Sequence, residues 1–200
     1  MQVIGITGGI GCGKSAVLNM LPDLCKCMVI EADKVAHEVM KKGQIAYEAI
    51  VKEFSTDILG KEKEIDRKIL GNIVFSNEEK LAVLNSIVHP MVKTRIKEII
   101  EEKKKEGLLD FIFIEAALLL EDHYEEICNE IWYIYAPFDS RKQRLIKARG
   151  LSEEKILSII KEQRSEEQFR RDCDKVVDNG GSIEDTRKEI VKLLENIEHQ

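Results

Sequence analysis

The sequence predicts an α/β fold in which a five-stranded parallel sheet lies between two layers of helices. Five short apolar runs alternate with stretches of helical periodicity, and strands joined by helices run parallel. A glycine-rich stretch separates the first apolar run from the first helical pattern, at the carboxyl end of a strand, where open sheets bind ligands. With 44% hydrophobic and 34% charged residues, the 200-residue chain has the composition of one globular domain.

The strands and helices can be placed in order along the chain. We expect strands at residues 2–6, 27–30, 111–114, 131–135 and 176–177. Helices are expected at residues 14–21, at 139–168 and at 183–197. Between residues 33 and 105 the pattern is almost wholly helical, with a break at 55–63. That length exceeds a simple crossover between two strands, so we expect a helical insert that holds a second substrate.

We therefore expect one unit, residues 1–200, with three parts. The core comprises residues 1–32, 106–138 and 172–200. The substrate-binding insert comprises residues 33–105, and a helical lid rich in arginine and lysine comprises residues 139–171.

Composition excludes several classes of protein. A net charge of -6 argues against a general nucleic-acid binder. No apolar run approaches the roughly 18 residues of a membrane span, so no membrane partner and a cytoplasmic location are expected. The five cysteines are an odd set without metal-site spacing and are expected to be reduced; Cys25 and Cys27 alone do not make a metal site. Cys12 lies inside the glycine-rich stretch, where its oxidation would matter.

The glycine-rich stretch Gly8–Ser15 reads GGIGCGKS and fits the phosphate-loop pattern G-x-x-x-x-G-K-[S/T]. Glycines allow the backbone to wrap a phosphate, and the following helix adds the positive end of its dipole. Lys14 is expected to reach the β- and γ-phosphates of a nucleotide, and the Ser15 hydroxyl to bind Mg²⁺. At average glycine usage the pattern arises by chance in roughly one such chain in a hundred.

Two other interpretations of this stretch stay open. It can be a plain strand-to-helix turn. It also contains Gly11, Gly13 and Ala16 in the spacing of a dinucleotide fingerprint, for which Glu31 or Asp33 would supply the acidic residue. The dinucleotide interpretation leaves Lys14 and Ser15 without a purpose.

Other features indicate what is done with the phosphate. The chain has no N-K-x-D guanine motif, and Glu115 stands where a transport or helicase ATPase would have aspartate. The long helical insert and the arginine-rich segment around Arg144 are typical of the substrate and lid segments of a small-molecule kinase. A lid arginine stabilises the charge that spreads over the transferred phosphoryl group.

Across nearly its whole length the sequence resembles the dephospho-CoA kinases, which are P-loop kinases. The resemblance rests on GITGGIGCGKS, EADKVAHEV, IDRKIL, IVHPMV, EAALLLE, QRLIKARGLS and CDKVVDNGG, in this order. It implies ATP-dependent phosphorylation of the ribose 3′-hydroxyl of dephospho-CoA, with Mg²⁺, by a monomer or weak homo-oligomer. Asp33 is then the general base, Lys14 and Arg144 act on the phosphoryl group, and Arg67, His89 and Glu115 lie at the acceptor. The implied ATP site consists of Gly8, Gly9, Gly11, Cys12, Gly13, Lys14, Ser15, Ala16, Arg144, Asn179 and Gly180, with Asn179 and Gly180 beside the adenine.

The chain departs from the family pattern at three places. Glu31 replaces the first aspartate of D-A-D, and Glu115-Ala116-Ala117 replaces the start of D-V-P-L-L. Where the family has R-D-G, this chain has Ala148-Arg149-Gly150, so the arginine that assists Arg144 can be Arg141, Arg149 or Arg164.

Simpler structural roles compete for the same residues. Asp33 can be a helix N-cap, His89 before Pro90 a helix-boundary residue, and Arg67 a surface partner of Glu64. Asn179-Gly180 suits a type I′ turn, and Arg141 and Lys142 can simply be solvated. Two functional alternatives also stay open: a kinase of the nucleoside monophosphate or shikimate type, and a nucleotide-binding switch without turnover.

Overall fold

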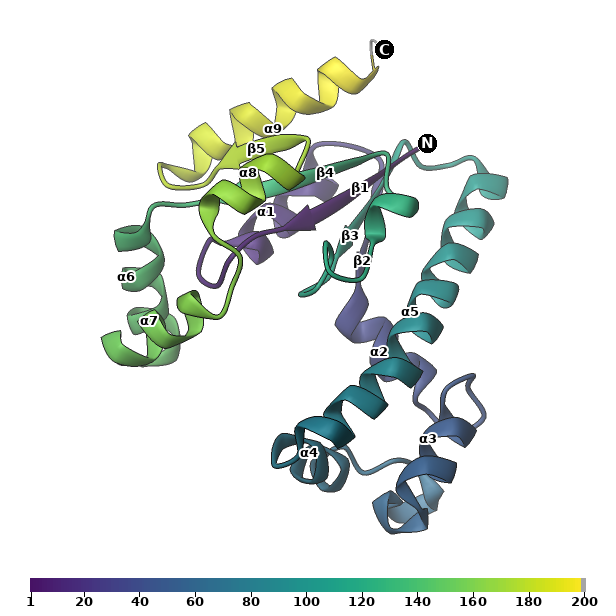
Figure 1. Ribbon diagram of the computed structural model, residues 1–200. Helices are drawn as coiled ribbons and strands as arrows, with labels where there is room; N and C mark the ends of the chain where they lie inside the picture. Colours follow the sequence, from purple (N-terminus) through teal and green to yellow (C-terminus); the bar gives the residue numbers. More distant parts are fainter. Residues whose placement is uncertain (199–200) are drawn as a thin grey trace. The chain divides into compact units, whose positions relative to one another are not determined.

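A computed structural model describes residues 1–198 and shows two compact units (Figure 1). The first unit consists of Met1–Val29 and the chain from Gly107 onward, and the second unit is Ile30–Glu106. None of the helices in the described part of the chain is both long enough and apolar enough to cross a bilayer.

The first unit is built on a five-stranded sheet with the strand order β2-β3-β1-β4-β5. The strands are β1 (Gln2–Thr7), β2 (Cys27–Glu31), β3 (Phe111–Glu115), β4 (Glu130–Tyr135) and β5 (Lys175–Asp178). β1 pairs in parallel with β3 and β4, and β4 pairs in parallel with β5. The expected five-stranded parallel sheet is confirmed. Each strand extends one or two residues beyond the apolar run that predicted it, because ladder hydrogen bonds continue onto polar residues such as Thr7 and Glu115.

Helices cover both faces of this sheet. On one face, Ile4, Ile6 and Trp132 pack with residues of α1 (Lys14–Met20) and α9 (Ile183–Glu198) in a single buried cluster. On the other face, Tyr133 stacks on Phe169 of α8 (Glu166–Asp172) with the ring centroids 4.7 Å apart. The three-layer arrangement predicted from the alternation of strands and helices is therefore confirmed.

The segment expected to be one helical stretch at 139–168 forms separate helices, α6 (Phe138–Arg149) and α7 (Glu153–Lys161), followed by α8. Gly150 ends α6 in the left-handed conformation, with φ at 63°. Ser152 then caps α7, and Ser165 forms a capping box with Gln168 at the start of α8. A glycine and two serines thus set the boundaries that helical periodicity alone did not resolve.

The second unit is helical. It contains α2 (Ala32–Val39), α3 (Tyr47–Phe54), α4 (Arg67–Phe75) and α5 (Glu78–Glu106), and two short 3₁₀ turns lie in the predicted break, at Thr56–Ile58 and Lys61–Lys63. α2, α3 and α4 all pack on α5.

Pro90 lies inside α5, so the helix boundary predicted at His89-Pro90 is wrong. An interior proline removes one backbone hydrogen bond and costs about 3 kcal/mol. The helix continues because Val88 and Val92 are buried on either side of the proline. In the turn that follows the proline, the Thr94 hydroxyl donates to the Pro90 carbonyl at 2.9 Å.

Candidate active site

The phosphate-loop stretch connects β1 to α1 and takes backbone conformations that favour glycine. Gly11 and Gly13 have φ angles of 78° and 91°. A Cβ atom on Gly11 would lie 2.9 Å from the Arg141 carbonyl oxygen, and one on Gly13 would lie 2.2 Å from Asn179 Nδ2. Both conformation and space therefore require glycine at these two positions.

The loop leaves a group of backbone N–H donors without a protein partner. Within residues 1–198, no acceptor receives a hydrogen bond from the backbone N–H of Gly11, Gly13, Lys14 or Ser15. These donors cluster where α1 begins, so the helix dipole adds to their partial positive charge. Such a concave group of N–H donors is suited to bind a phosphate anion.

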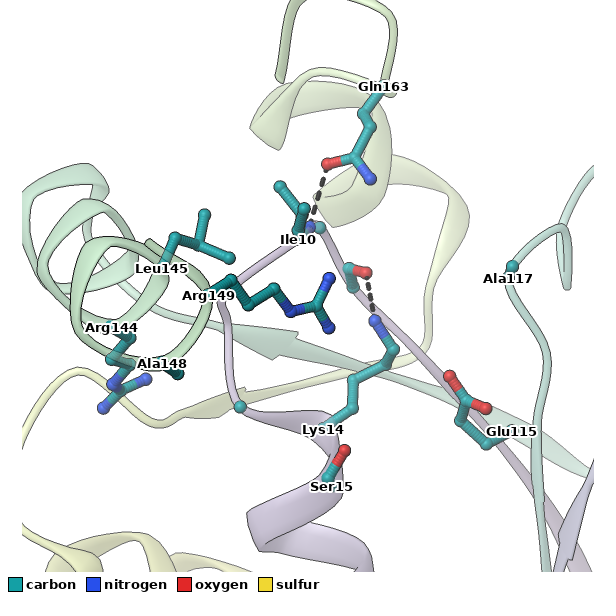
Figure 2. A pocket seen from close by; sticks show the side chains of 14 residues that line it. Ile10, Lys14, Ser15, Glu115, Ala117, Arg144, Leu145, Ala148, Arg149 and Gln163 are labelled. Carbon is teal, nitrogen blue, oxygen red and sulfur yellow. Dashed lines mark hydrogen bonds between the residues drawn. The ribbon is translucent and has the colours of Figure 1, made fainter. Parts of the chain in front are cut away.

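The loop forms one wall of a cavity of about 400 Å³ (Figure 2). All its lining residues come from the first unit: Gly8, Gly9, Ile10, Gly11, Gly13, Lys14, Ser15, Glu115, Ala117, Arg144, Leu145, Ala148, Arg149 and Gln163. Three cations and one carboxylate line this space, which makes it electropositive. That balance favours a polyphosphate ligand.

Lys14 reaches back over the loop, and its Nζ atom donates to the Gly8 carbonyl oxygen at 2.8 Å (Figure 2). Glu115 ends β3 beside Ile6 of β1, so the parallel register brings its carboxylate to the same edge of the sheet as the loop. The Ser15 hydroxyl and the Glu115 carboxylate thus line one cavity. Both are hard oxygen ligands of the kind Mg²⁺ prefers.

The four arginines considered at the lid have different partners. Arg144 donates to the carbonyl oxygens of Cys12 at 3.2 Å and Asn179 at 2.7 Å, so it braces the loop from behind. Arg149 projects into the cavity near Lys14 (Figure 2). Arg164 is paired with two carboxylates, Glu121 and Asp172, outside the cavity lining.

Arg141 is not simply solvated, as one interpretation had it, because its Nε atom donates to the Ile10 carbonyl at 2.8 Å. Its neighbour Lys142 does remain half-exposed, paired with Glu153. Of the three arginines left open by the sequence, only Arg149 is among the residues that line the cavity.

Asn179 is 4% exposed and holds the phosphate loop from within the protein. Its Nδ2 atom donates to the Cys12 carbonyl at 2.8 Å, and its Oδ1 atom accepts from the Thr186 hydroxyl at 3.1 Å. The expected type I′ turn is wrong, since neither Asn179 nor Gly180 has a positive φ angle. Gly180 is required by space instead: a Cβ atom there would lie 2.4 Å from Pro137 Cδ.

The remaining residues of the expected ATP site do not face the cavity. Cys12 is 2% exposed and belongs to the buried cluster beneath the loop, while Ala16 is exposed on α1. Cys25 and Cys27 are free thiols, and a hydrogen bond from Cys25 lowers the pKa of Cys27. Over the described residues no group of three or more His, Cys, Asp and Glu side chains could hold a metal ion.

The predicted acceptor residues Asp33, Arg67 and His89 belong to the second unit. Asp33 is exposed at the second position of α2, whose N-cap is Glu31, so the N-cap interpretation of Asp33 is wrong. Arg67 begins α4 and is exposed. His89 lies half-buried on α5.

His37 joins this group, although the sequence analysis did not single it out. Desolvation lowers the pKa of His37, the Arg67 charge lowers it further, and the Asp33 carboxylate raises it. The second unit therefore brings Asp33 and Arg67 within electrostatic reach of His37. The i, i+4 spacing of Asp33 and His37 could have identified His37 from the sequence, because that spacing places the two residues on one face of a helix.

Comparison with known proteins agrees with this geometry. The family model described as dephospho-CoA kinase matches residues 2–185. A dephospho-CoA kinase from Carboxydothermus hydrogenoformans is 39% identical over 98% of this chain and 94% of its own, and one from Aquifex aeolicus is 40% identical over 98% of both chains. A solved dephospho-CoA kinase from Campylobacter jejuni superposes with a TM-score of 0.73 and 32% identity, covering 98% of this chain and 96% of its own. The chain belongs to the dephospho-CoA kinase family.

Proposed function

We propose that this protein transfers the γ-phosphoryl group of ATP to the ribose 3′-hydroxyl of dephospho-CoA and so forms coenzyme A. The observation that carries the proposal is the electropositive cavity around Lys14, lined by unpaired backbone N–H donors, in a chain of the dephospho-CoA kinase family. A phosphate-loop site without this lysine would bind phosphate more weakly, because the ammonium supplies the only full charge on the loop itself.

The residues of the cavity fit the triphosphate of ATP. The four unpaired N–H donors suit a phosphate at the start of α1, and Lys14 and Arg149 supply cations further into the cavity. The Ser15 hydroxyl and the Glu115 carboxylate are the oxygens present to hold Mg²⁺. Mg²⁺, when bound, would neutralise part of the phosphate charge. Glu115 was expected at the acceptor, and its place on this wall is compatible with either role.

In the proposed reaction, the acceptor hydroxyl must lose its proton as the phosphoryl group arrives. We assign that proton to Asp33, an exposed carboxylate that caps no helix. Arg67, His89 and the newly identified His37 are proposed to bind the acceptor around it. The two arginines Arg144 and Arg149 are proposed to stabilise the charge on the transferred group, Arg149 from the cavity and Arg144 partly by bracing the loop.

An acceptor panel tests this proposal. Purified protein is given ATP and Mg²⁺ with dephospho-CoA, AMP, shikimate or no acceptor, and ADP release is measured. We expect release that depends on dephospho-CoA. Release with AMP or shikimate instead would support another small-molecule kinase, and binding of ATP without any acceptor-dependent release would support a switch.

The same assay tests Asp33. We expect Asp33→Asn to keep ATP binding and lose roughly 10²-fold or more in kcat, the usual range for a general base. Asparagine has nearly the same shape, so the fold should be preserved. Wild-type turnover and an unchanged melting temperature in Asp33→Asn would rule out the base.

A further inference from the structure

The lid segment holds both backbone polar groups of Ile10, in the middle of the phosphate loop. The Ile10 N–H donates to Gln163 Oε1 at 2.9 Å (Figure 2). The Ile10 carbonyl accepts from Arg141 Nε at 2.8 Å. The Gln163 contact spans 153 positions of the chain, and the Arg141 contact spans 131. No residue of the loop itself supplies a partner for either group.

Both side chains approach the loop closely at Gly9. A Cβ atom on Gly9 would lie 2.6 Å from Arg141 Nη2 and 3.1 Å from Gln163 Oε1. An alanine there would push the two side chains away from Ile10. The absence of a side chain at Gly9 is thus what allows this two-sided contact.

Gln163 itself needs a support, because it lies beyond the end of α7 and is exposed. The next residue, Arg164, provides one. Its guanidinium pairs with Glu121 at 2.5 Å, in the segment after β3, and with Asp172 at 2.6 Å, at the end of α8. Ser165 then caps α8, so the short connection that carries Gln163 is fixed by its neighbours.

We infer that Gln163 is a positioning residue for the phosphate loop, holding the Ile10 peptide opposite Arg141, and that Arg164 acts through Gln163. Both contacts are made between protein groups, so they organise the loop equally for ATP and for the transition state. Uniform stabilisation of this kind lowers KM and leaves kcat unchanged. The inference rests on the proposed function only in that ATP is the ligand of the loop.

The test is ATP binding by calorimetry together with steady-state kinetics. Gln163→Met keeps the length of the side chain and removes its acceptor oxygen. We expect the Kd and KM for ATP to rise about 2- to 13-fold, the effect of one net hydrogen bond, with kcat and the KM for dephospho-CoA within about 2-fold. Gln163→Asn, which keeps the amide but is one methylene too short, should weaken ATP binding similarly.

Arg164→Ala should raise the Kd for ATP in the same range, and Gln163→Met should then add little to it. Arg170→Ala is the matched control. It removes a similar charge from α8, where Arg170 pairs with Glu166, but supports no loop contact, and it should leave the Kd unchanged.

Three results would overturn the inference: an unchanged Kd for ATP in both Gln163 variants, a fall in kcat without a change in Kd, or full additivity of the Gln163 and Arg164 substitutions. If the wild-type protein bound no ATP, the proposed function would fail, and that outcome is recognised before any variant is measured.

Discussion

Replacing Asn179 by alanine separates two roles for this residue, an adenine contact and an internal support of the phosphate loop. The side chain makes one hydrogen bond to the Cys12 carbonyl and accepts one from Thr186, and both are lost in Asn179→Ala. At about 0.5–1.5 kcal/mol for each net hydrogen bond, the two together contribute about 1–3 kcal/mol. Cys12 and Thr186 keep other partners, so no buried polar group is stranded.

For a chain of this length, 1 kcal/mol corresponds to about 2–4 °C in Tm, so we expect Asn179→Ala to lower the Tm by about 2–12 °C without nucleotide. Asn179→Asp should lower it further, because it places a carboxylate oxygen against the Cys12 carbonyl. The measurement is thermal melting by circular dichroism, with the exposed Asn196→Ala as control, expected to change the Tm by about 2 °C or less. An unchanged Tm for Asn179→Ala with a raised KM for ATP would refute the internal role and restore the adenine contact.

Three further outcomes follow from the site and its surroundings. Arg149→Ala should lower kcat by on the order of 10³-fold with little change in Tm. Arg144→Ala should also lower the Tm, because the Arg144 side chain braces the loop. Equal effects of the two substitutions on Tm would contradict this division of roles. Because the folded protein lowers the pKa of His37 below its ordinary 6.5, the unfolded chain binds the extra proton first. The contribution of His37 to stability should therefore be constant above about pH 6.5 and fall at lower pH. His37→Gln should remove this contribution and flatten the fall in stability at acid pH in pH-dependent urea melts, and an unaltered fall would count against it. In native protein treated with iodoacetamide, Cys27 should react before Cys173, since burial raises the pKa of Cys173 to about 12; mass spectrometry showing the reverse order would contradict the geometry.

The fold and the phosphate loop could be predicted because their signals are local. Alternating periodicity marks strands and helices, and G-x-x-x-x-G-K-S describes the backbone needs of eight consecutive residues. The glycines confirm this reasoning, since Gly11 and Gly13 have both positive φ angles and no room for a side chain.

The supports of the loop could not be predicted, because they are contacts between distant segments. Nothing local in the sequence of Gln163, Arg141 or Asn179 reveals that each bonds a backbone group of the loop more than 130 residues away. Pro90 shows the opposite failure: a strong local signal for a helix boundary was overridden by packing of the surrounding helix.

Arg149 shows what the structure adds where the sequence departs from the family motif. In Ala148-Arg149-Gly150 the arginine stands one position later than in the family pattern. The sequence gives no way to decide whether Arg149 still acts as a lid arginine beside Arg144. Arg149 lines the cavity at the end of α6, next to the glycine that terminates the helix. Its last-turn position allows a long side chain to reach the loop despite the shift.

The most direct measurement of the central claim follows the label from [γ-³²P]ATP into dephospho-CoA, with wild-type protein and with Lys14→Ala. The account predicts a labelled product carrying its new phosphate on the ribose 3′-oxygen, identified by phosphorus–proton NMR. It also predicts no detectable product with Lys14→Ala at an unchanged Tm, because the only hydrogen bond of the Lys14 ammonium within residues 1–198 goes to the Gly8 carbonyl, and Lys14 is not a core residue. Transfer by Lys14→Ala at the wild-type rate, or wild-type protein that labels a different acceptor and leaves dephospho-CoA unmodified, would contradict it.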